Sequence, residues 1–246
     1  MFSLKNALKR IIERFGFRVS RVPRLEGKSL KFAPDPEDQF KWLASMNIDI
    51  VVDVGAHTGE SASLFLNIFP GAKVYSFEPL ADCFASLSKL SETSNRLVPF
   101  NMALGASTGQ AKINRSSFSP SSSILRMGDT HKNAFPFTSG ETSEVIQMST
   151  LDIQSHDFPS GGNVLLKIDT QGYEMQVLLG ATKFLDRVSV IIVELSFLSL
   201  YKEQPLFADV YKWLESRGFL YRGSWGQLYD PRDGTPIQQD GIFVRS

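Results

Sequence analysis

The sequence predicts an α/β fold in which a doubly wound, mostly parallel sheet ends in a C-terminal antiparallel hairpin. The first observation is that four continuous apolar runs, typical of strands buried on both faces, each carry an acid at or near their carboxyl end. These runs are VVDVG with Asp53, VYSFEP with Glu78, LLKID with Asp169 and IIVEL with Glu194. The second is that strand-like and helix-like patterns alternate from Ile48 onward. Because ligands bind beyond the carboxyl ends of strands in such sheets, we expect the four acids to gather at one small-molecule site.

The individual elements follow from local patterns. The first half is predicted to hold a strand at 48–54, a helix at 59–68, a strand at 73–78, a helix from 79 to about 90 and a strand at 97–103. The second half is predicted to hold strands at 144–151, 164–169 and 189–195, helices at 173–180 and 205–217, and a hairpin of 219–225 with 241–246. Between them, residues 105–142 are rich in Ser, Thr, Gly and Phe. We expect a short strand at 111–115 there, within a long loop of the kind that forms lids or binding loops.

Composition narrows the class of protein. With 246 residues, 42% hydrophobic and 21% charged, the chain has the make-up of a soluble globular domain. Cys83 is the only cysteine and the three histidines have no ligand-like spacing, so we expect no disulfide framework and no metal site. One cysteine also fits a reducing compartment, and we expect a cytoplasmic location. The net charge is zero but residues 1–31 are basic, so the rest is acidic, which argues against nucleic-acid binding.

Residues 1–46 are predicted to form a helical extension to a domain that spans 47–246. In the segment 3–15, apolar residues recur at helical spacing with basic residues between them. This pattern fits a helix packed on the domain or on a second copy in a homo-oligomer. The alternative is weak contact with an anionic membrane surface. A second short helix is expected at about 37–46.

The strongest local motif is DVGAHTGE at 53–60, in the turn between the first strand and its helix. Glycines at Gly55 and Gly59 let the backbone pass close to a ligand, because no Cβ stands in the way. The flanking carboxylates of Asp53 and Glu60 would repel a pyrophosphate, which dinucleotide folds bind at this turn. The motif therefore favours S-adenosylmethionine, with its positive amino and sulfonium groups, over NAD. The alternative is a tight turn that binds nothing.

Four further residues, at strand ends or in the helical turn that follows, are candidates for the site. Glu78 is placed to accept hydrogen bonds from both ribose hydroxyls of a nucleoside, or else it is only an acid that precedes a helix. Lys167 and Asp169 are two apart in a strand and therefore share a face. A lysine in a buried strand is costly unless paired, and Asp169 is its nearest candidate partner. Glu174, in the next helical turn, has either a site role or a stabilising role at the helix N-terminus.

Histidines and the loop supply the remaining candidates. His57 could take a proton from an attacking hydroxyl, or could instead hydrogen-bond the backbone or a cofactor carboxylate. We expect His131 and His156 to be exposed loop residues. The serine-rich run 119–123 is placed to line an acceptor pocket. Three aromatic residues of the loop are expected to anchor it more than to stack on a substrate: Phe118, Phe135 and Phe137.

These stretches resemble the FkbM-type S-adenosylmethionine-dependent methyltransferases over roughly residues 48–246. The matching stretches are VVDVGAHTGE, VYSFEPL, NMALG, MSTLD, LLKIDTQGYEMQVLLGA, IIVEL and DGIFV. The resemblance implies a Rossmann-like methyltransferase fold with strand order 3-2-1-4-5-7-6. It also implies that the first two stretches hold the amino-acid and ribose parts of the cofactor and that the third lies near the adenine. The cofactor contacts that follow are Asp53, Gly55, Ala56, His57, Thr58, Gly59, Glu60, Glu78, Pro79, Asn101, Ala103 and Leu104.

Two positions depart from the family's usual pattern. Such enzymes often have an asparagine where this chain has His57 and a glutamate where it has Gln171, and either change could alter the acceptor pocket. The catalytic candidates are Asp169, Lys167, His57 and Glu174. Asp169 and His57 are the two candidate bases.

The predicted reaction is in-line methyl transfer from the sulfonium to a hydroxyl oxygen of a small-molecule acceptor. The resemblance implies a sugar or natural-product hydroxyl, such as that of a glycoside. The alternatives are methylation of nitrogen or of a protein, a metal-assisted reaction that uses the clustered acids, and a non-catalytic nucleoside-binding domain of the same fold.

Overall fold

A computed structural model describes residues 41–246 of the protein. The predicted amphipathic segment 3–15 and most of the predicted extension therefore lie outside the described residues. The helix α2 (Lys41–Ala44) is the described part of the helix expected at 37–46. A compact unit spans Trp42–Ser246, and Leu43 is 1% exposed within one of its apolar clusters. The domain boundary at 46, the membrane contact and the homo-oligomer stay predictions.

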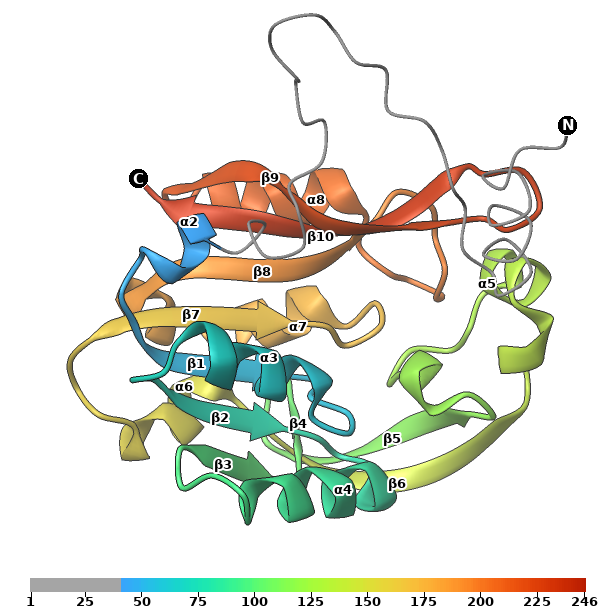
Figure 1. The fold of residues 1–246 in the computed structure, drawn as a ribbon. Coiled ribbons are helices and arrows are strands. Elements are labelled where there is room, and N and C mark those ends of the chain that lie inside the picture. Colours follow the sequence, from blue (N-terminus) through green and yellow to red (C-terminus); the bar gives the residue numbers. More distant parts are fainter. Residues whose placement is uncertain (1–40) are drawn as a thin grey trace, which may run out of the picture. The chain divides into compact units, whose positions relative to one another are not determined.

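A seven-stranded sheet forms the centre of the unit, in the order β3-β2-β1-β7-β8-β10-β9 (Figure 1). Its parallel strands are β3 (Leu97–Phe100), β2 (Lys73–Phe77), β1 (Ile48–Val54), β7 (Asn163–Ile168) and β8 (Val188–Ser196). The strands β10 (Pro236–Arg245) and β9 (Phe219–Tyr229) pair antiparallel at one end. Counted within this sheet, the order is 3-2-1-4-5-7-6. The predicted doubly wound sheet with its C-terminal hairpin is confirmed.

Helices cover both faces of the sheet. They are α3 (Glu60–Ile68), α4 (Ala81–Ser91), α6 (Leu151–Gln154), α7 (Glu174–Leu179) and α8 (Phe207–Glu215). Short 3-10 turns occur at Ser119–Ser121, Pro136–Thr138, Ser155–Asp157 and Phe184–Arg187. Within 41–246, no helix is long and apolar enough to cross a membrane.

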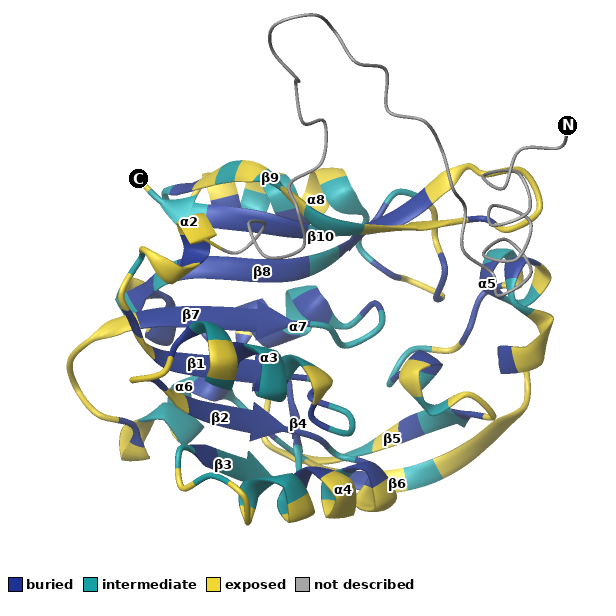
Figure 2. Cartoon of the chain, viewed as in Figure 1, coloured by how far each residue is buried: buried dark blue, intermediate teal, exposed yellow. Residues whose placement is uncertain are grey.

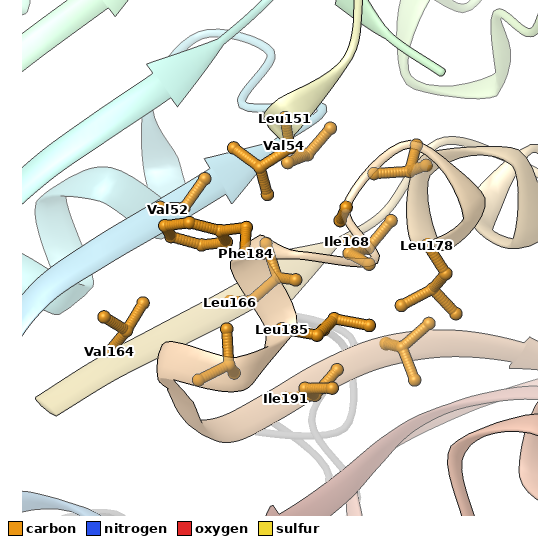
Figure 3. Close-up of a cluster of buried hydrophobic side chains, with 14 of the residues drawn as sticks. Val52, Val54, Leu151, Val164, Leu166, Ile168, Leu178, Phe184, Leu185 and Ile191 are labelled. Carbon is orange, nitrogen blue, oxygen red and sulfur yellow. The ribbon is translucent and has the colours of Figure 1, made fainter. Parts of the chain in front are cut away.

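Two apolar cores result from the alternation of side chains along the strands. Val52, Leu166 and Ile191 belong to the core that includes residues of α7 and α8, and Figure 3 shows part of it. Their chain neighbours Val51 and Leu165 belong to the other core, which includes residues of α3 and α4. The central strands are accordingly buried along nearly their whole length (Figure 2). Burial on both faces explains why these strands read as continuous apolar runs.

A second, three-stranded sheet in the order β4-β6-β5 was not predicted. The strand expected at 97–103 is two strands, β3 and β4 (Ala103–Leu104), which belong to different sheets. The long loop expected at 105–142 holds β5 (Gly109–Ser116), the helix α5 (Asp129–Ala134) and the start of β6 (Glu141–Ser149). Strands β5 and β6 pair antiparallel from Gly109 with Met148 to Ser116 with Glu141. The strand predicted at 111–115 is confirmed as part of β5. The helix α5 and the start of β6 were not predicted, because pairing between segments this far apart leaves no local period.

Candidate functional site

A cavity of about 700 Å³ lies beyond the carboxyl ends of β1, β2 and β7. This volume falls within the usual range for small-molecule sites, about 300–1,000 Å³. Figure 1 shows these strand ends pointing toward the segment between β5 and α5. One side, the acid-and-glycine wall, is formed by Gly55, Ala56, His57, Glu60, Glu78, Lys167 and Asp169. The opposite side, the serine wall, is the segment 117–124.

The glycine turn is fixed by its contacts with neighbouring backbone. Gly55 has a φ of +81°, and a Cβ there would lie 1.8 Å from the carbonyl oxygen of Asp169. The amides of Gly55 and Ala56 both donate to the carbonyl of Phe77, at 3.0 and 3.1 Å. The turn thus joins the ends of β1, β2 and β7. A Cβ on Gly59, with φ +95°, would meet the Leu90 side chain at 2.6 Å, so this glycine is required by packing against α4.

Glu78 lines the cavity and connects the turn after β1 with the turn after β2. It is 5% exposed, and its carboxylate accepts hydrogen bonds from the amide of Leu80 at 2.8 Å and that of His57 at 2.9 Å. Burial nevertheless raises the pKa of this carboxyl to about 7, because the two amide bonds only partly offset the loss of water. The Asn101 side chain donates to the carbonyls of Glu78 and Pro79, at 2.9 and 3.1 Å, and so supports this turn from outside the cavity.

Lys167 pairs with two acids on neighbouring strand ends. Its Nζ lies 3.3 Å from Oδ2 of Asp169 and 3.7 Å from Oδ1 of Asp53, which confirms the predicted partner. Burial lowers the pKa of Lys167, but the attraction of Asp169 and Asp53 outweighs it and raises the pKa above its ordinary value. Asp53 is fully buried, and neither of its carboxylate oxygens accepts a hydrogen bond from the described residues. Burial raises the pKa of Asp53. This residue does not line the cavity.

Gln171 connects Asp169 with the fourth strand-end acid. Its Nε2 donates to Oδ1 of Asp169 at 2.9 Å and to the two oxygens of Glu194 at 2.9 and 3.1 Å. Burial first, and then the negative charge of Asp169, raise the pKa of Glu194 well above its ordinary value. Lys167 and Gln171 thus link Asp53, Asp169 and Glu194 along one sheet edge, as the apolar runs predicted.

Glu174 binds the backbone of the turn that follows β7. It is 3% exposed, and its Oε1 accepts hydrogen bonds from the amides of Thr170 and Gly172, at 2.9 and 3.0 Å. Burial raises the pKa of Glu174 to about 7. The carboxylate holds the loop that carries Asp169 and Gln171 and does not line the cavity.

The serine wall is held to the acid-and-glycine wall by side-chain hydrogen bonds. Oγ of Ser119 lies 2.8 Å from Nε2 of His57, and Oγ of Ser123 donates to the carbonyl of Gln171 at 2.7 Å. Both His57 and Gln171 have left-handed backbone conformations, with φ of 49° and 55°. Such conformations are uncommon outside glycine and concentrate at functional sites.

Two predictions need correction: that Phe118 and Phe137 anchor the loop, and that His131 is an exposed loop residue. Phe118 and Phe137 are 46% and 65% exposed, and their rings meet edge to face at 5.6 Å. They form an exposed pair, and Phe118 lines the cavity, whereas Phe135 is half-buried and packs on His131 at 5.5 Å. His131 itself is 4% exposed. It lies in α5, which the irregular composition of 105–142 did not reveal.

Most of the predicted site residues lie on the cavity surface. Those that line it are Gly55, Ala56, His57, Glu60, Glu78, Pro79, Ala103, Leu104, Lys167 and Asp169. Those that lie outside the lining are Asp53, Thr58, Gly59, Asn101 and Glu174. Tyr201 was missed: its hydroxyl donates to Oε1 of Gln171 at 2.9 Å, across 30 residues of sequence. No local pattern marks such a contact. Within 41–246, no group of three His, Cys, Asp or Glu side chains is arranged to hold a metal ion.

Comparison with known proteins agrees with this architecture. The model described as the FkbM methyltransferase domain matches residues 53–221. This match and the strand order together place the chain in the class of proteins with a Rossmann-like methyltransferase fold. More particularly, the chain belongs to the FkbM methyltransferase family.

Individual proteins that resemble the chain share 31% sequence identity or less with it. Hexuronic acid methyltransferase AglP of Haloferax volcanii is 31% identical over 153 residues, which are 60% of this chain and 56% of AglP. The chain thus matches just over half the length of that relative. A Streptococcus thermophilus rRNA methylase structure has a TM-score of 0.45 at 12% identity, covering 88% of this chain and 99% of that one. A magnesium protoporphyrin IX methyltransferase of Synechocystis PCC 6803 has 0.46 at 14%, covering 85% and 77%. The fold assignment rests on the strand order and not on these scores.

Proposed function

We propose that this methyltransferase transfers the methyl group of S-adenosylmethionine to an oxygen of a sugar-like small molecule. The observation that carries the proposal is a single cavity with two unlike walls. The acid-and-glycine wall suits a zwitterionic, positively charged methyl donor. The serine wall offers hydroxyl groups beside an exposed aromatic ring, which suits a ring that carries both hydroxyls and apolar C–H faces.

On the acid-and-glycine wall, the proposed roles follow from position. Glu78 accepts hydrogen bonds from the two ribose hydroxyls, because its buried carboxylate faces the cavity and retains free lone pairs. The turn at 55–57 lies against the amino-acid part of the cofactor, and Glu60 lies at the rim of the same turn. Ala103 and Leu104 supply an apolar surface for the adenine.

At the junction of the two walls, Asp169 is the proposed proton acceptor. When bound, the cofactor supplies an electrophilic methyl group on a sulfonium. Asp169 lines the cavity beside Lys167, and a carboxylate there can orient an acceptor hydroxyl and take its proton as the oxygen attacks. His57 is the alternative base, although its Nε2 is already engaged with Ser119 at 2.8 Å.

The sugar-like acceptor is supported by one relative. AglP acts on a hexuronic acid by its name, and its similarity to this chain extends that chemistry as a proposal. A hexuronic acid offers both hydroxyl and carboxylate oxygens to a methyl donor. We propose the hydroxyl as the acceptor group, because a hydroxyl requires a proton acceptor such as Asp169 and a carboxylate does not.

Calorimetry and mass spectrometry test the proposal together. S-adenosylhomocysteine is expected to bind the full chain, and NAD is not. The protein is then incubated with S-adenosylmethionine and a panel of methyl glycosides and methyl hexuronides, and the products are examined for the gain of one methyl group. Mild alkali removes a methyl ester but not a methyl ether, so it separates carboxylate from hydroxyl methylation. Binding of NAD without S-adenosylhomocysteine, or methylation of amines or proteins only, would contradict the proposal.

A further inference from the structure

The amide of Gln171 lies between two carboxylates. Its Nε2 is 2.9 Å from Oδ1 of Asp169 and 2.9 Å from Oε1 of Glu194. The orientation of the amide is set at its other end, because the hydroxyl of Tyr201 donates to Oε1 at 2.9 Å. With the oxygen engaged by a donor, the nitrogen with its two protons must face the acids.

Negative charge accumulates around this amide. Asp169 and Glu194 meet at Nε2 of Gln171, and the further acids that act on Glu194 are Glu174 and Asp240. Lys167 is the cation that faces this group, and Asp53 shares it. Partly buried carboxylates at one place repel each other unless a cation, a proton or hydrogen-bond donors hold them. Proteins commonly use a divalent cation with oxygen ligands for this purpose. Here an ammonium and an amide already occupy the space between the carboxylates.

Resting on the function proposed above, we propose that Gln171 is a positioning residue for Asp169. Its amide, oriented by Tyr201, ties Asp169 to Glu194 and takes the place that a divalent cation would otherwise occupy. Asp169 is then held toward the acceptor with one oxygen bonded to Gln171 and the other to Lys167, and the transfer needs no metal ion.

The backbone of Gln171 adds to this function. Its φ of 55° is left-handed, and its carbonyl accepts a hydrogen bond from Oγ of Ser123 at 2.7 Å. The hydroxyl of Tyr201, a residue that is 1% exposed, also lies 3.0 Å from the carbonyl oxygen of Ser121, so its single proton is shared between this oxygen and Oε1 of Gln171. The serine wall, Tyr201 and Asp169 are therefore joined through one residue. A change at Gln171 should disturb the carboxylate geometry and the acceptor wall together while leaving the cofactor side intact.

Gln171→Glu in the full chain tests the proposal without knowledge of the acceptor. It adds a third carboxylate where the amide stood. The matched control is Gln176→Glu, which adds the same charge on α7 at a half-buried position outside the cavity lining. The probes are magnesium chloride alone, followed by calorimetry, and the carboxyl-carbon NMR signal of Glu194, assigned by its loss in Glu194→Gln.

Two results are expected. Gln171→Glu should gain saturable magnesium binding that the wild type and Gln176→Glu lack, because three carboxylates then converge. It should also raise the titration midpoint of Glu194 by about one pH unit or more, because a like charge has been added beside it. Magnesium that shifts the Glu194 signal in the wild type at similar concentration would overturn the proposal, as would a Glu194 midpoint unchanged in Gln171→Glu.

The third measurement is the rate at which the protein methylates a sugar of the panel that the wild type accepts. At pH 7, Gln171→Glu should lose about 10–100-fold in single-turnover rate, with the acid limb of its pH profile moved to higher pH, while binding of S-adenosylhomocysteine stays within about threefold. Tyr201→Phe, which leaves the amide unoriented, should lose a smaller factor. An unchanged pH profile in an active, folded Gln171→Glu variant would refute the positioning role. If no sugar is methylated by the wild type, the proposed function fails, while the magnesium and NMR measurements still decide the role of Gln171.

Discussion

The two walls of the cavity are built by different means. The acid-and-glycine wall stands on the ends of adjacent parallel strands, and the register of β1 with β7 places Asp53 directly opposite Lys167. The serine wall is a short segment between β5 and α5, and its bonds to the opposite wall are made by the side chains of Ser119 and Ser123. A continuous backbone ladder therefore fixes one wall. The other is fixed by one isolated backbone bridge, between Ser123 and Asn114 of β5, and by a few side chains. We infer that the first wall tolerates little change, whereas the second can vary to suit an acceptor.

The largest expected effect lies where the walls meet. Asp169→Asn keeps the shape of the side chain but removes the charge. The rate of methyl transfer to an acceptor sugar should therefore fall about 10²–10⁴-fold, the usual contribution of a positioned proton acceptor. Binding of S-adenosylhomocysteine should change little. The control is Asp186→Asn, an exposed acid outside the cavity. If Asp169 only pairs with Lys167, the variant should instead melt at lower temperature with its turnover retained, and His57 would become the candidate base.

The backbone of the acid-and-glycine wall supplies the next prediction. Gly55→Ala places a Cβ 1.8 Å from the carbonyl oxygen of Asp169, at a φ of +81°. The left-handed conformation costs roughly 1–2 kcal/mol and overpacking roughly 1–3 kcal/mol, so the free energy of unfolding should fall by about 3 kcal/mol. Urea denaturation measures this. Gly71→Ala is the control, because nothing lies within 4 Å of its Cβ position. Equal stability of both variants would show that the turn can relax away from β7.

The same difference explains what the sequence could predict. Val51 to Val54 and Leu165 to Ile168 are buried on both faces, so their strands appear as local apolar runs, and the residues after them fall at the sheet edge. The pairing of Lys167 with Asp169 also follows from spacing within one strand. By contrast, β5 and β6 alternate buried and exposed residues only weakly, and they pair across a segment that contains α5. Tyr201 reaches Gln171 only because β7 and β8 are neighbours, and no local pattern encodes that contact.

A third prediction concerns the cofactor contact on the acid-and-glycine wall. Glu78→Ala should weaken binding of S-adenosylhomocysteine by about 1.5–3 kcal/mol, the range for hydrogen bonds to a charged group. Calorimetry measures the change, with Glu92→Ala as an exposed control outside the cavity. Because Glu78 also accepts a hydrogen bond from the amide of His57, circular dichroism should confirm that the variant is folded. Wild-type affinity in a folded variant would show that Glu78 only orders the two turns.

The pH dependence of binding sharpens that result. Burial raises the pKa of Glu78 to about 7, and ribose hydroxyls donating to the carboxylate would stabilise its charged form and lower the pKa in the complex. Affinity for S-adenosylhomocysteine should therefore be full above pH 7 and should fall as the pH drops through 7, by at most about tenfold per unit. Glu78→Gln should remove this dependence. If the affinity of the wild type for S-adenosylhomocysteine does not depend on pH, the ribose does not contact Glu78.

The smallest expected effect belongs to the serine wall. Phe118 lines the cavity and is 46% exposed, and Phe137, which packs on it, is 65% exposed. Exposed aromatic surface of this kind often marks a ligand-binding groove. Phe118→Ala should raise the KM for a sugar acceptor by a factor that corresponds to about 0.5–1.5 kcal/mol, with little change in kcat or in cofactor affinity. Phe137→Ala should act in the same direction but less, because Phe137 only supports the ring of Phe118 at 5.6 Å. Val145→Ala on β6, also exposed at 62%, is the control. If Phe118→Ala changes stability but not KM, the pair serves to order the segment, and acceptor recognition rests on the serine hydroxyls alone.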